Sequence, residues 1–285
     1  MNYQWYPGHM MKAKRMMQED IRLIDLVIEI IDARVPLSSR NPDIDELGKN
    51  KARLIVLNKA DLADERQNDA WAAFFQEKGY FTAKVNARSG AGMKKIQETI
   101  QEACKEKIER DRRRGIMNRP VRAMVVGIPN AGKSTFINTL AGKASAKTGN
   151  KPGVTKGKQW IRLNKSIELL DTPGILWPKF EDQMVGLRLA VVGSIKDELL
   201  QAEELALWLL DYTRGHYPGL LQARYQIPEE GSKLELLGGI ANARGCKLKG
   251  DVPDYPKAAV LFIDDFRSGR LGRLTLEQPP VRSMV

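Results

Sequence analysis

The chain has 285 residues, of which 42% are hydrophobic, so it is long enough for two domains with cores of their own. Its formal net charge of +11 and its pI of about 9.6 indicate an anionic partner. The two cysteines, Cys104 and Cys246, lack metal-ligand spacing and are typical of a reducing compartment. With no signal segment and no apolar run long enough to span a membrane, we expect a cytoplasmic protein that does not bind a membrane.

The first predicted elements are a helix and a strand. The segment Trp5–Met10 leads into the helix, and Asp25–Ile31 has the apolar composition of a buried strand. His9 lies in a Tyr-Pro-Gly-His turn, and its imidazole titrates in a range that suits proton transfer. A packing or helix-capping role is the alternative for this histidine.

A second apolar strand, Arg53–Leu57, leads into the motif Asn58-Lys59-Ala60-Asp61. The carboxylate of Asp61 can accept hydrogen bonds from the N1 and N2 donors of guanine, whereas adenine presents an acceptor at N1. The motif therefore predicts a guanine site at the carboxyl end of a parallel sheet. A turn or helix cap after a strand is the alternative.

A third strand, Phe81–Val85, ends in Asn86-Ala87-Arg88-Ser89-Gly90. This segment is similar to the Ser-Ala-Lys type of motif that contacts the base through its backbone, with Asn86 in place of serine. We therefore place Asn86 and Ala87 in the nucleotide site. Helices are predicted on either side, over Glu65–Lys78 and Met93–Arg110.

The fourth strand, Arg122–Val126, leads into Gly127-Ile-Pro-Asn-Ala-Gly-Lys-Ser134, which has the G-x-x-x-x-G-K-S pattern of a phosphate-binding loop. In such a loop the backbone N–H groups surround the phosphates, Lys133 reaches the β and γ oxygens, and the Ser134 hydroxyl binds magnesium. The helix predicted over Ser134–Leu140 begins where its positive end faces the phosphates. The predicted nucleotide contacts of this region are Asn130, Ala131, Gly132, Lys133, Ser134 and Thr135.

The strand Ile167–Leu170 precedes Asp171-Thr-Pro-Gly174. Asp171 would hold magnesium through water, and the Gly174 N–H would bond the γ-phosphate, so that loss of this phosphate releases the segment. Thr155, in a Pro-Gly-Val-Thr segment between the phosphate loop and this motif, is the candidate for a second magnesium ligand.

The catalytic step lacks a residue that many GTPases have. They place a glutamine after the glycine of the Asp-Thr-Pro-Gly motif to orient the attacking water, whereas Ile175 stands here. We therefore expect slow hydrolysis by the free protein. The predicted catalytic residues are His9, Lys133, Thr155 and Gly174. Asn130 resembles the asparagine that coordinates potassium in cation-dependent GTPases, with a loop-bracing hydrogen bond as the alternative.

Six predicted strands, including Gln159–Leu163, alternate with helices, which predicts a doubly wound, mostly parallel α/β sheet. The guanine motif precedes the phosphate loop, the reverse of the order in Ras-like proteins. Residues 1–178 are therefore predicted to form a circularly permuted P-loop GTPase domain, with the usual termini joined through Lys105–Arg122. Residues 179–285 are predicted to form a small all-α domain with helices over Phe180–Val192, Ala202–Thr213, Glu229–Ala243 and Asp254–Ser268.

The excess positive charge lies in the first of these domains. From Leu176 onward there are 14 basic and 15 acidic residues, which leaves 32 and 20 before it. Lys143–Lys158 has five lysines and no acid, and Lys105–Arg122 has eight basic residues against three acids. Together with Lys12, Lys14 and Arg15, these segments favour an RNA-binding surface around the nucleotide site, with an ordinary solvated surface as the alternative. The same two interpretations apply to the basic turns of Arg244, Lys247 and Lys249 and of Arg267, Arg270 and Arg273.

These motifs, together with Trp5–Met10, Asp32–Pro36, Ser39–Pro42 and Asp171–Pro178, resemble the ribosome biogenesis GTPase A family over nearly the whole chain. The resemblance implies a bacterial GTPase that binds GTP or GDP with magnesium and assists late maturation of the large ribosomal subunit. It also implies that the C-terminal domain contacts ribosomal RNA and that the subunit stimulates hydrolysis, which times release. Potassium is a further candidate cofactor.

A different class of function remains open, in which a GTPase switch acts in translation or RNA modification on another RNA. The sequence shows no metal cluster, activated cysteine or second cofactor loop of its own for RNA modification. The assembly factor is therefore favoured. Because no coiled-coil heptads are present, we expect a monomer.

Overall fold

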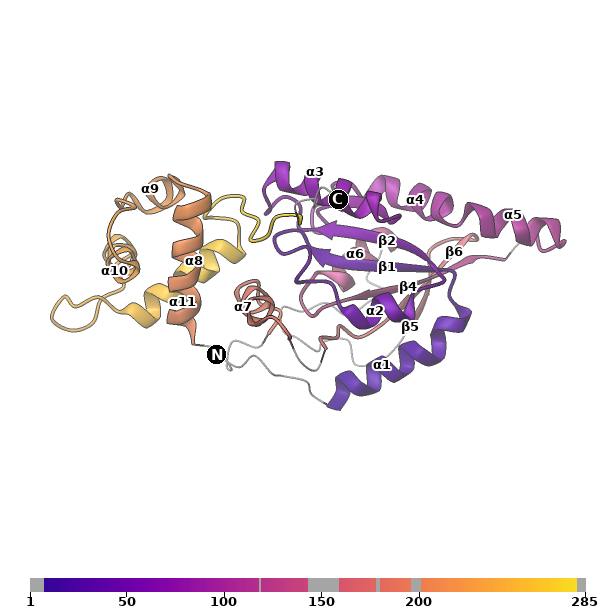
Figure 1. The fold of residues 1–285 in the computed structure, drawn as a ribbon, viewed down its shortest axis with the longest axis horizontal. Coiled ribbons are helices and arrows are strands. Elements are labelled where there is room, and N and C mark those ends of the chain that lie inside the picture. The colour runs from indigo at the N-terminus through magenta and orange to yellow at the C-terminus, as the bar shows by residue number, and fades with distance from the viewer. Residues whose placement is uncertain (1–7, 118, 143–158, 178–179, 196–200, 281–285) are drawn as a thin grey trace.

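The computed structural model describes residues 8–117, 119–142, 159–177, 180–195 and 201–280. A twisted sheet with helices on both faces forms one half of the elongated molecule, and a group of helices forms the other (Figure 1). This arrangement confirms the predicted α/β fold followed by an all-helical region.

The sheet has six strands in the order β3-β2-β1-β4-β6-β5. All neighbours pair in parallel except β5, which runs antiparallel to β6. The strands are β1 (Leu26–Asp32), β2 (Ala52–Asn58), β3 (Phe81–Val85), β4 (Val121–Gly127), β5 (Gln159–Arg162) and β6 (Ile167–Asp171). Each lies within two residues of its predicted bounds, because the apolar runs that bury a strand on both faces are readable in the sequence.

The helices of this half cover both faces of the sheet. They are α1 (Gly8–Asp20), α2 (Pro42–Leu47), α3 (Glu65–Glu77), α4 (Ile96–Ala103), α5 (Lys105–Arg113) and α6 (Lys133–Ala141). Successive residues of a strand point to opposite faces. Leu57 of β2 accordingly packs with Trp71 and Phe75 of α3, whereas Val56 belongs to the larger core that includes Ile96 of α4. The sheet is therefore doubly wound, as predicted.

One predicted helix is wrong in its extent. The range Met93–Arg110 contains a 3₁₀ turn, Met93–Lys95, and then two α-helices, α4 and α5, that meet at Cys104. Cys104 is buried and has φ −105° and ψ 10°, outside the helical region. Periodicity alone did not reveal this break because helix-forming residues lie on both sides of it.

The second half consists of α7 (Gln183–Val191), α8 (Ala202–His216), α9 (Leu220–Tyr225), α10 (Lys233–Ala243) and α11 (Tyr255–Arg267). Helix α10 begins with a capping box in which Ser232 and Glu235 bond each other's backbone. Helix α7 lies between the sheet and the group formed by α8 to α11 (Figure 1). It thus connects the two halves.

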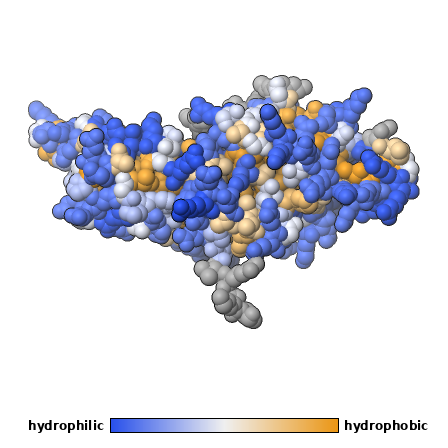
Figure 2. All heavy atoms as spheres, turned by 90° about the horizontal axis from the view of Figure 1, so that it is seen from above, coloured by the Kyte–Doolittle hydropathy of each residue, from blue (hydrophilic) through white to orange (hydrophobic). Residues whose placement is uncertain are grey.

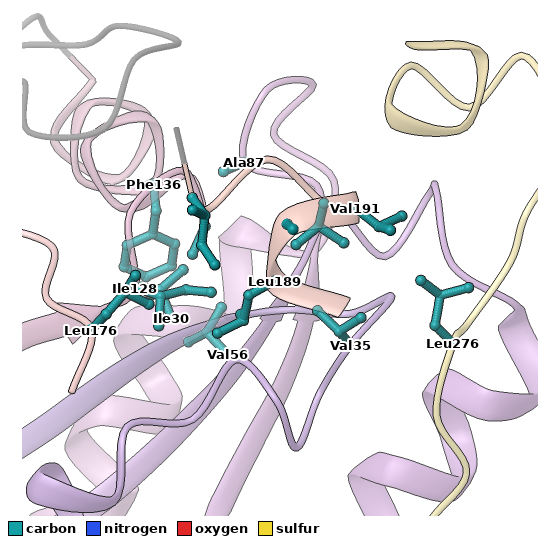
Figure 3. Packing of buried hydrophobic residues seen from close by; sticks show 14 of the residues in the cluster. Ile30, Val35, Val56, Ala87, Ile128, Phe136, Leu176, Leu189, Val191 and Leu276 are labelled. Atoms are coloured by element: carbon teal, nitrogen blue, oxygen red, sulfur yellow. The ribbon is translucent and has the colours of Figure 1, made fainter. Parts of the chain in front are cut away.

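The chain returns to the sheet after α11. The backbone N–H of Leu276 donates to the carbonyl of Arg34 at 2.7 Å, and that of Leu274 donates to the carbonyl of Leu62 at 3.1 Å. Figure 3 shows Leu276 beside Val35, in a cluster that continues through Leu189 of α7 to Ile30 of β1. The hydrophobic core is therefore continuous across residue 178, and the domain boundary at that position stays a prediction.

Hydrophilic side chains cover most of the face shown in Figure 2, and hydrophobic residues form separate smaller areas on it. Among the described residues, no helix combines the length and the apolar character needed to cross a membrane.

Candidate nucleotide-binding site

The predicted motifs meet at one edge of the sheet. The carboxyl ends of the parallel strands bring together five residues: Asp32, Asn58, Gly127 and Asp171, which end β1, β2, β4 and β6, and Asn86, which directly follows β3. In an open α/β sheet this edge is where ligands bind. The strand order therefore assembles motifs that are more than 100 residues apart in the sequence.

Asn58 joins three of these loops through one buried side chain. Its Nδ2 donates to the carbonyl of Ala131 in the phosphate loop at 2.7 Å. Its Oδ1 accepts from the backbone N–H of Ala87 at 3.0 Å. The carbonyl of Ala87 in turn accepts from the Thr139 hydroxyl of α6 at 2.7 Å. The guanine motif, the phosphate loop and the segment after β3 are thereby held at fixed separations.

Lys59 forms a second connection between the same loops. Its Nζ donates to the carbonyl of Asn130 at 2.7 Å and to Oδ2 of Asp32 at 2.8 Å. Ala60 is anchored by its backbone N–H, which donates to the carbonyl of Val85 at 3.1 Å. Asp61 follows with an exposed side chain. Its carboxylate is therefore accessible to a base held against this loop.

The phosphate loop has the backbone conformation that its glycines suggest. Gly132 has φ 90°, and a Cβ at this position would lie 2.3 Å from Nδ2 of Asn58. Asn130 also has a positive φ, 61°. Helix α6 begins at Lys133 directly after the loop, and Ser134 and Thr135 lie in its first turn. The positive end of this helix therefore faces the loop, as an anion site requires.

The Asp-Thr-Pro-Gly segment lies against the phosphate loop. Nζ of Lys133 is 2.8 Å from Oδ1 of Asp171, and both side chains are buried. The Thr172 hydroxyl donates to the carbonyl of Val125 at 2.8 Å, and a Cβ on Gly174 would lie 3.1 Å from Cα of Pro129. These contacts place the predicted phosphate and magnesium groups beside one another.

Ile175 is buried, and its backbone N–H donates to the carbonyl of Gly127 at 3.2 Å. Its side chain has no polar atom that could orient water. Thr155 and the lysine-rich segment 143–158 lie outside the described residues, as does the side chain of His9, whose backbone belongs to the first turn of α1. Their predicted roles stay predictions.

Two predicted ligands make structural hydrogen bonds. The Oδ1 atom of Asn86 accepts from the backbone N–H groups of Arg88 and Ser89, which closes the loop after β3. Nδ2 of Asn130 donates to the carbonyl of Gly193, after α7, at 2.6 Å. Asn130 therefore makes a hydrogen bond that braces the phosphate loop, and this bond joins the loop to a segment distant in the sequence. Its role toward potassium stays a prediction.

The sequence reasoning assigned no role to Asp32, which is buried beneath the site. Its two carboxylate oxygens accept from Nε and Nη2 of Arg34 at 2.9 and 2.7 Å. Burial alone would raise the pKa of Asp32, but the charges of Arg34 and Lys59 hold this pKa far below its usual range. One signal was available in the sequence, because Asp32 directly follows the predicted buried strand Asp25–Ile31.

Together these loops define a guanine-nucleotide GTPase whose motifs are circularly permuted. Residues 122–235 match the family model described as 50S ribosome-binding GTPase. The matched range begins in β4 and includes the phosphate loop and the Asp-Thr-Pro-Gly segment.

Relatives are similar over nearly the full chain. A ribosome biogenesis GTPase A from Bacillus cereus is 52% identical, over 97% of this chain and 94% of its own length. The mouse mitochondrial ribosome-associated GTPase 1 is 35% identical, over 96% of this chain and 90% of its own. A crystal structure of GNP-bound YlqF from Thermotoga maritima is 30% identical, with a TM-score of 0.66, over 94% of this chain and 98% of its own. The chain belongs to the ribosome biogenesis GTPase A family.

Proposed function

We propose that this protein binds GTP with magnesium, hydrolyses it to GDP and phosphate, and assists late assembly of the large ribosomal subunit. One observation supports this proposal most directly. The side chain of Asn58, in the guanine motif, bonds both the phosphate loop and the segment after β3. The name of the Bacillus cereus relative and the 50S description of the matching family model support the ribosomal role.

The residues at the sheet edge fit a magnesium-bound nucleotide. Asp171 and Ser134 supply oxygen atoms, which magnesium prefers, and the N–H groups at the start of α6 suit phosphates. The bond between Lys133 and Asp171 would be exchanged on binding, since phosphate oxygens would receive the ammonium and water on magnesium would face the carboxylate. Both charges would keep a partner, so the exchange costs little electrostatic energy.

The bound metal would neutralise charge that develops on the phosphates. Lys133 would support this neutralisation, and the Gly174 N–H would bond the γ-phosphate. Because Ile175 cannot orient water, the free protein should turn over slowly. We infer that docking on the subunit presses the segments that carry His9 and Thr155 around the γ-phosphate. Asn130 would supply potassium dependence through its side-chain Oδ1, since Nδ2 is the atom that bonds Gly193.

The partner is expected to be ribosomal RNA together with ribosomal proteins. The excess positive charge precedes Leu176, and exposed basic residues of α5, such as Arg112 and Arg113, belong to that part of the chain. The helices of residues 179–285 would contribute further RNA contacts. We expect the protein to act as a cytoplasmic monomer.

A single-turnover GTP hydrolysis assay tests the proposal. The large subunit should accelerate hydrolysis, whereas the small subunit, as the matched control, should not. No GTP binding would overturn the nucleotide site. GTP binding without acceleration by the large subunit would overturn the assembly role and would favour a GTPase that acts on another RNA.

A further inference from the structure

A ring of polar contacts links the nucleotide loops to the C-terminal ends of α7 and α11. It passes from Lys59 through Asp32, Arg34, Arg267 and Asn130 back to Lys59. We propose that Asp32, Arg34 and Arg267 are positioning residues that hold Lys59 and the phosphate loop in their binding conformation and make nucleotide affinity depend on how α7 and α11 are seated. The proposal deepens the proposed function, because it rests on guanine-nucleotide binding at this site.

The first part of the ring lies beneath the guanine motif. Asp32 receives Nζ of Lys59 at 2.8 Å, and the same ammonium donates to the carbonyl of Asn130 at 2.7 Å. Asp32 is buried, so its charge acts on Lys59 with little screening by water. The carboxylate thereby fixes the lysine that spans the guanine motif and the phosphate loop.

Arg34 connects this carboxylate to α11. Its side chain is 1% exposed, and its guanidinium forms a bidentate pair with Asp32. Nη1 of Arg34 also donates to the carbonyl of Arg267, the last residue of α11, at 3.3 Å. Its Cζ lies 5.0 Å from the centre of the Phe266 ring. Arg34 therefore joins Asp32, the carboxylate that holds Lys59, to the end of a C-terminal helix.

Arg267 continues the ring to α7. Its Nε donates to the carbonyl of Val191 at 2.9 Å, and its Nη2 donates to the carbonyl of Ala190 at 2.8 Å. A cation suits these carbonyls, because they belong to the last turn of α7, where the helix has its negative end.

The ring then closes on the phosphate loop. Two residues after the end of α7, the carbonyl of Gly193 accepts from Nδ2 of Asn130 at 2.6 Å. Asn130 therefore bonds Lys59 through its carbonyl and the α7 end through its side chain. A displacement of α7 or α11 must break or re-form bonds that hold the nucleotide loops. Linkage then requires nucleotide binding to bias the seating of these helices by the same factor.

The experiment compares Arg267→Met with Arg270→Met by fluorescence titration with a labelled GDP and magnesium. Arg270 lies three residues farther along and pairs with Asp265 within the C-terminal helices, so it is a matched control. We expect Arg267→Met to weaken GDP binding roughly three- to tenfold and Arg270→Met to leave it within twofold. Arg267→Lys should recover part of the affinity, since one of the two carbonyls can still be reached. An unchanged affinity in folded Arg267→Met overturns the proposal.

A second measurement separates positioning from general loss of stability. Asp32→Asn and Glu29→Gln both neutralise a buried carboxylate of β1, but Glu29 pairs with Arg40 and Arg53, away from the nucleotide loops. In a double-mutant cycle on GDP affinity, Arg267→Met should be non-additive with Asp32→Asn and additive with Glu29→Gln. Additivity in both cycles contradicts the proposal. If the parent protein itself fails to bind GDP, the proposed function fails instead.

Discussion

The exposed carboxylate of Asp61 should decide which base is bound, because it accepts hydrogen bonds that only guanine can donate at N1 and N2. In Asp61→Asn, an amide N–H would face the donors of guanine but could pair with the additional carbonyl of xanthine. We expect GTP affinity to fall about a hundredfold or more and XTP affinity to rise. Competitive binding of the two nucleotides measures this change. A variant that prefers GTP as the parent does would contradict the guanine assignment.

Asp32 should contribute to stability as well as to positioning. Asp32→Asn leaves the guanidinium of Arg34 buried without its counter-ion, so we expect the free energy of unfolding to fall by about 3 kcal/mol at neutral pH.

The stability contributed by Asp32 depends on pH in a defined direction. Because its folded-state pKa is lowered from 3.8, the folded protein binds fewer protons than the unfolded protein near and below that value. The stability that Asp32 contributes is therefore complete at pH values above 3.8, its ordinary pKa, and declines as the pH falls below that value. Urea unfolding of parent and variant should show a difference that narrows below about pH 4. A difference that widens with acidity would contradict the ion-pair account.

At the scale of elements, the turn into α6 depends on a glycine that cannot be replaced without a collision. Gly132→Ala would place Cβ 2.3 Å from Nδ2 of Asn58, in addition to the strain of φ 90°. Gly79→Ala is the matched control, because Gly79 has φ 82° but no atom within 4 Å of the added carbon. Both variants should lose about 1 to 2 kcal/mol of stability, because an added Cβ is strained in the left-handed backbone conformation.

Only Gly132→Ala should also lose nucleotide affinity, by at least tenfold, because the collision displaces the side chain that joins three loops. Calorimetric binding of GDP to both variants measures the effect. Equal affinities would mean that Asn58 does not set the loop geometry.

The elements themselves were largely predictable from the sequence, and the reasons are local. Buried strands have apolar runs, and the glycines and the lysine of the phosphate loop have a fixed spacing. The break at Cys104 was not predicted because helix-forming residues lie on both sides of it. The helices α2 and α9 were not predicted because each has only six residues, too few for a periodic pattern. The bonds from Asn130 to Gly193 and from Arg34 to Arg267 could not be predicted, because they join segments separated by 63 and 233 residues.

At the scale of the whole molecule, the affinity for RNA should depend strongly on the salt concentration. Each phosphate that a lysine or arginine neutralises releases counter-ions, so affinity for the subunit should fall steeply as salt is raised. Replacing Lys151, Lys156 and Lys158 with glutamine should reduce the slope of log affinity against log salt by roughly two to three. A filter-binding series across salt concentrations gives both slopes. An identical slope would mean that this segment is an ordinary solvated surface.

The continuous core and the tail that returns to β1 make the molecule suited to coupling two binding events. Helix α7 lies between the sheet and the other C-terminal helices (Figure 1), and its end bonds the phosphate loop. If the C-terminal helices dock on RNA, the same contacts can change how tightly GTP is held.

Co-sedimentation with the large subunit in the presence of a non-hydrolysable GTP analogue or of GDP tests the central claim most directly. The account predicts that the protein migrates with the large subunit in the GTP-like state, that GDP weakens this association at least tenfold, and that the small subunit retains none of it. Equal association in both nucleotide states, or none with the large subunit, would contradict a nucleotide-switched assembly factor.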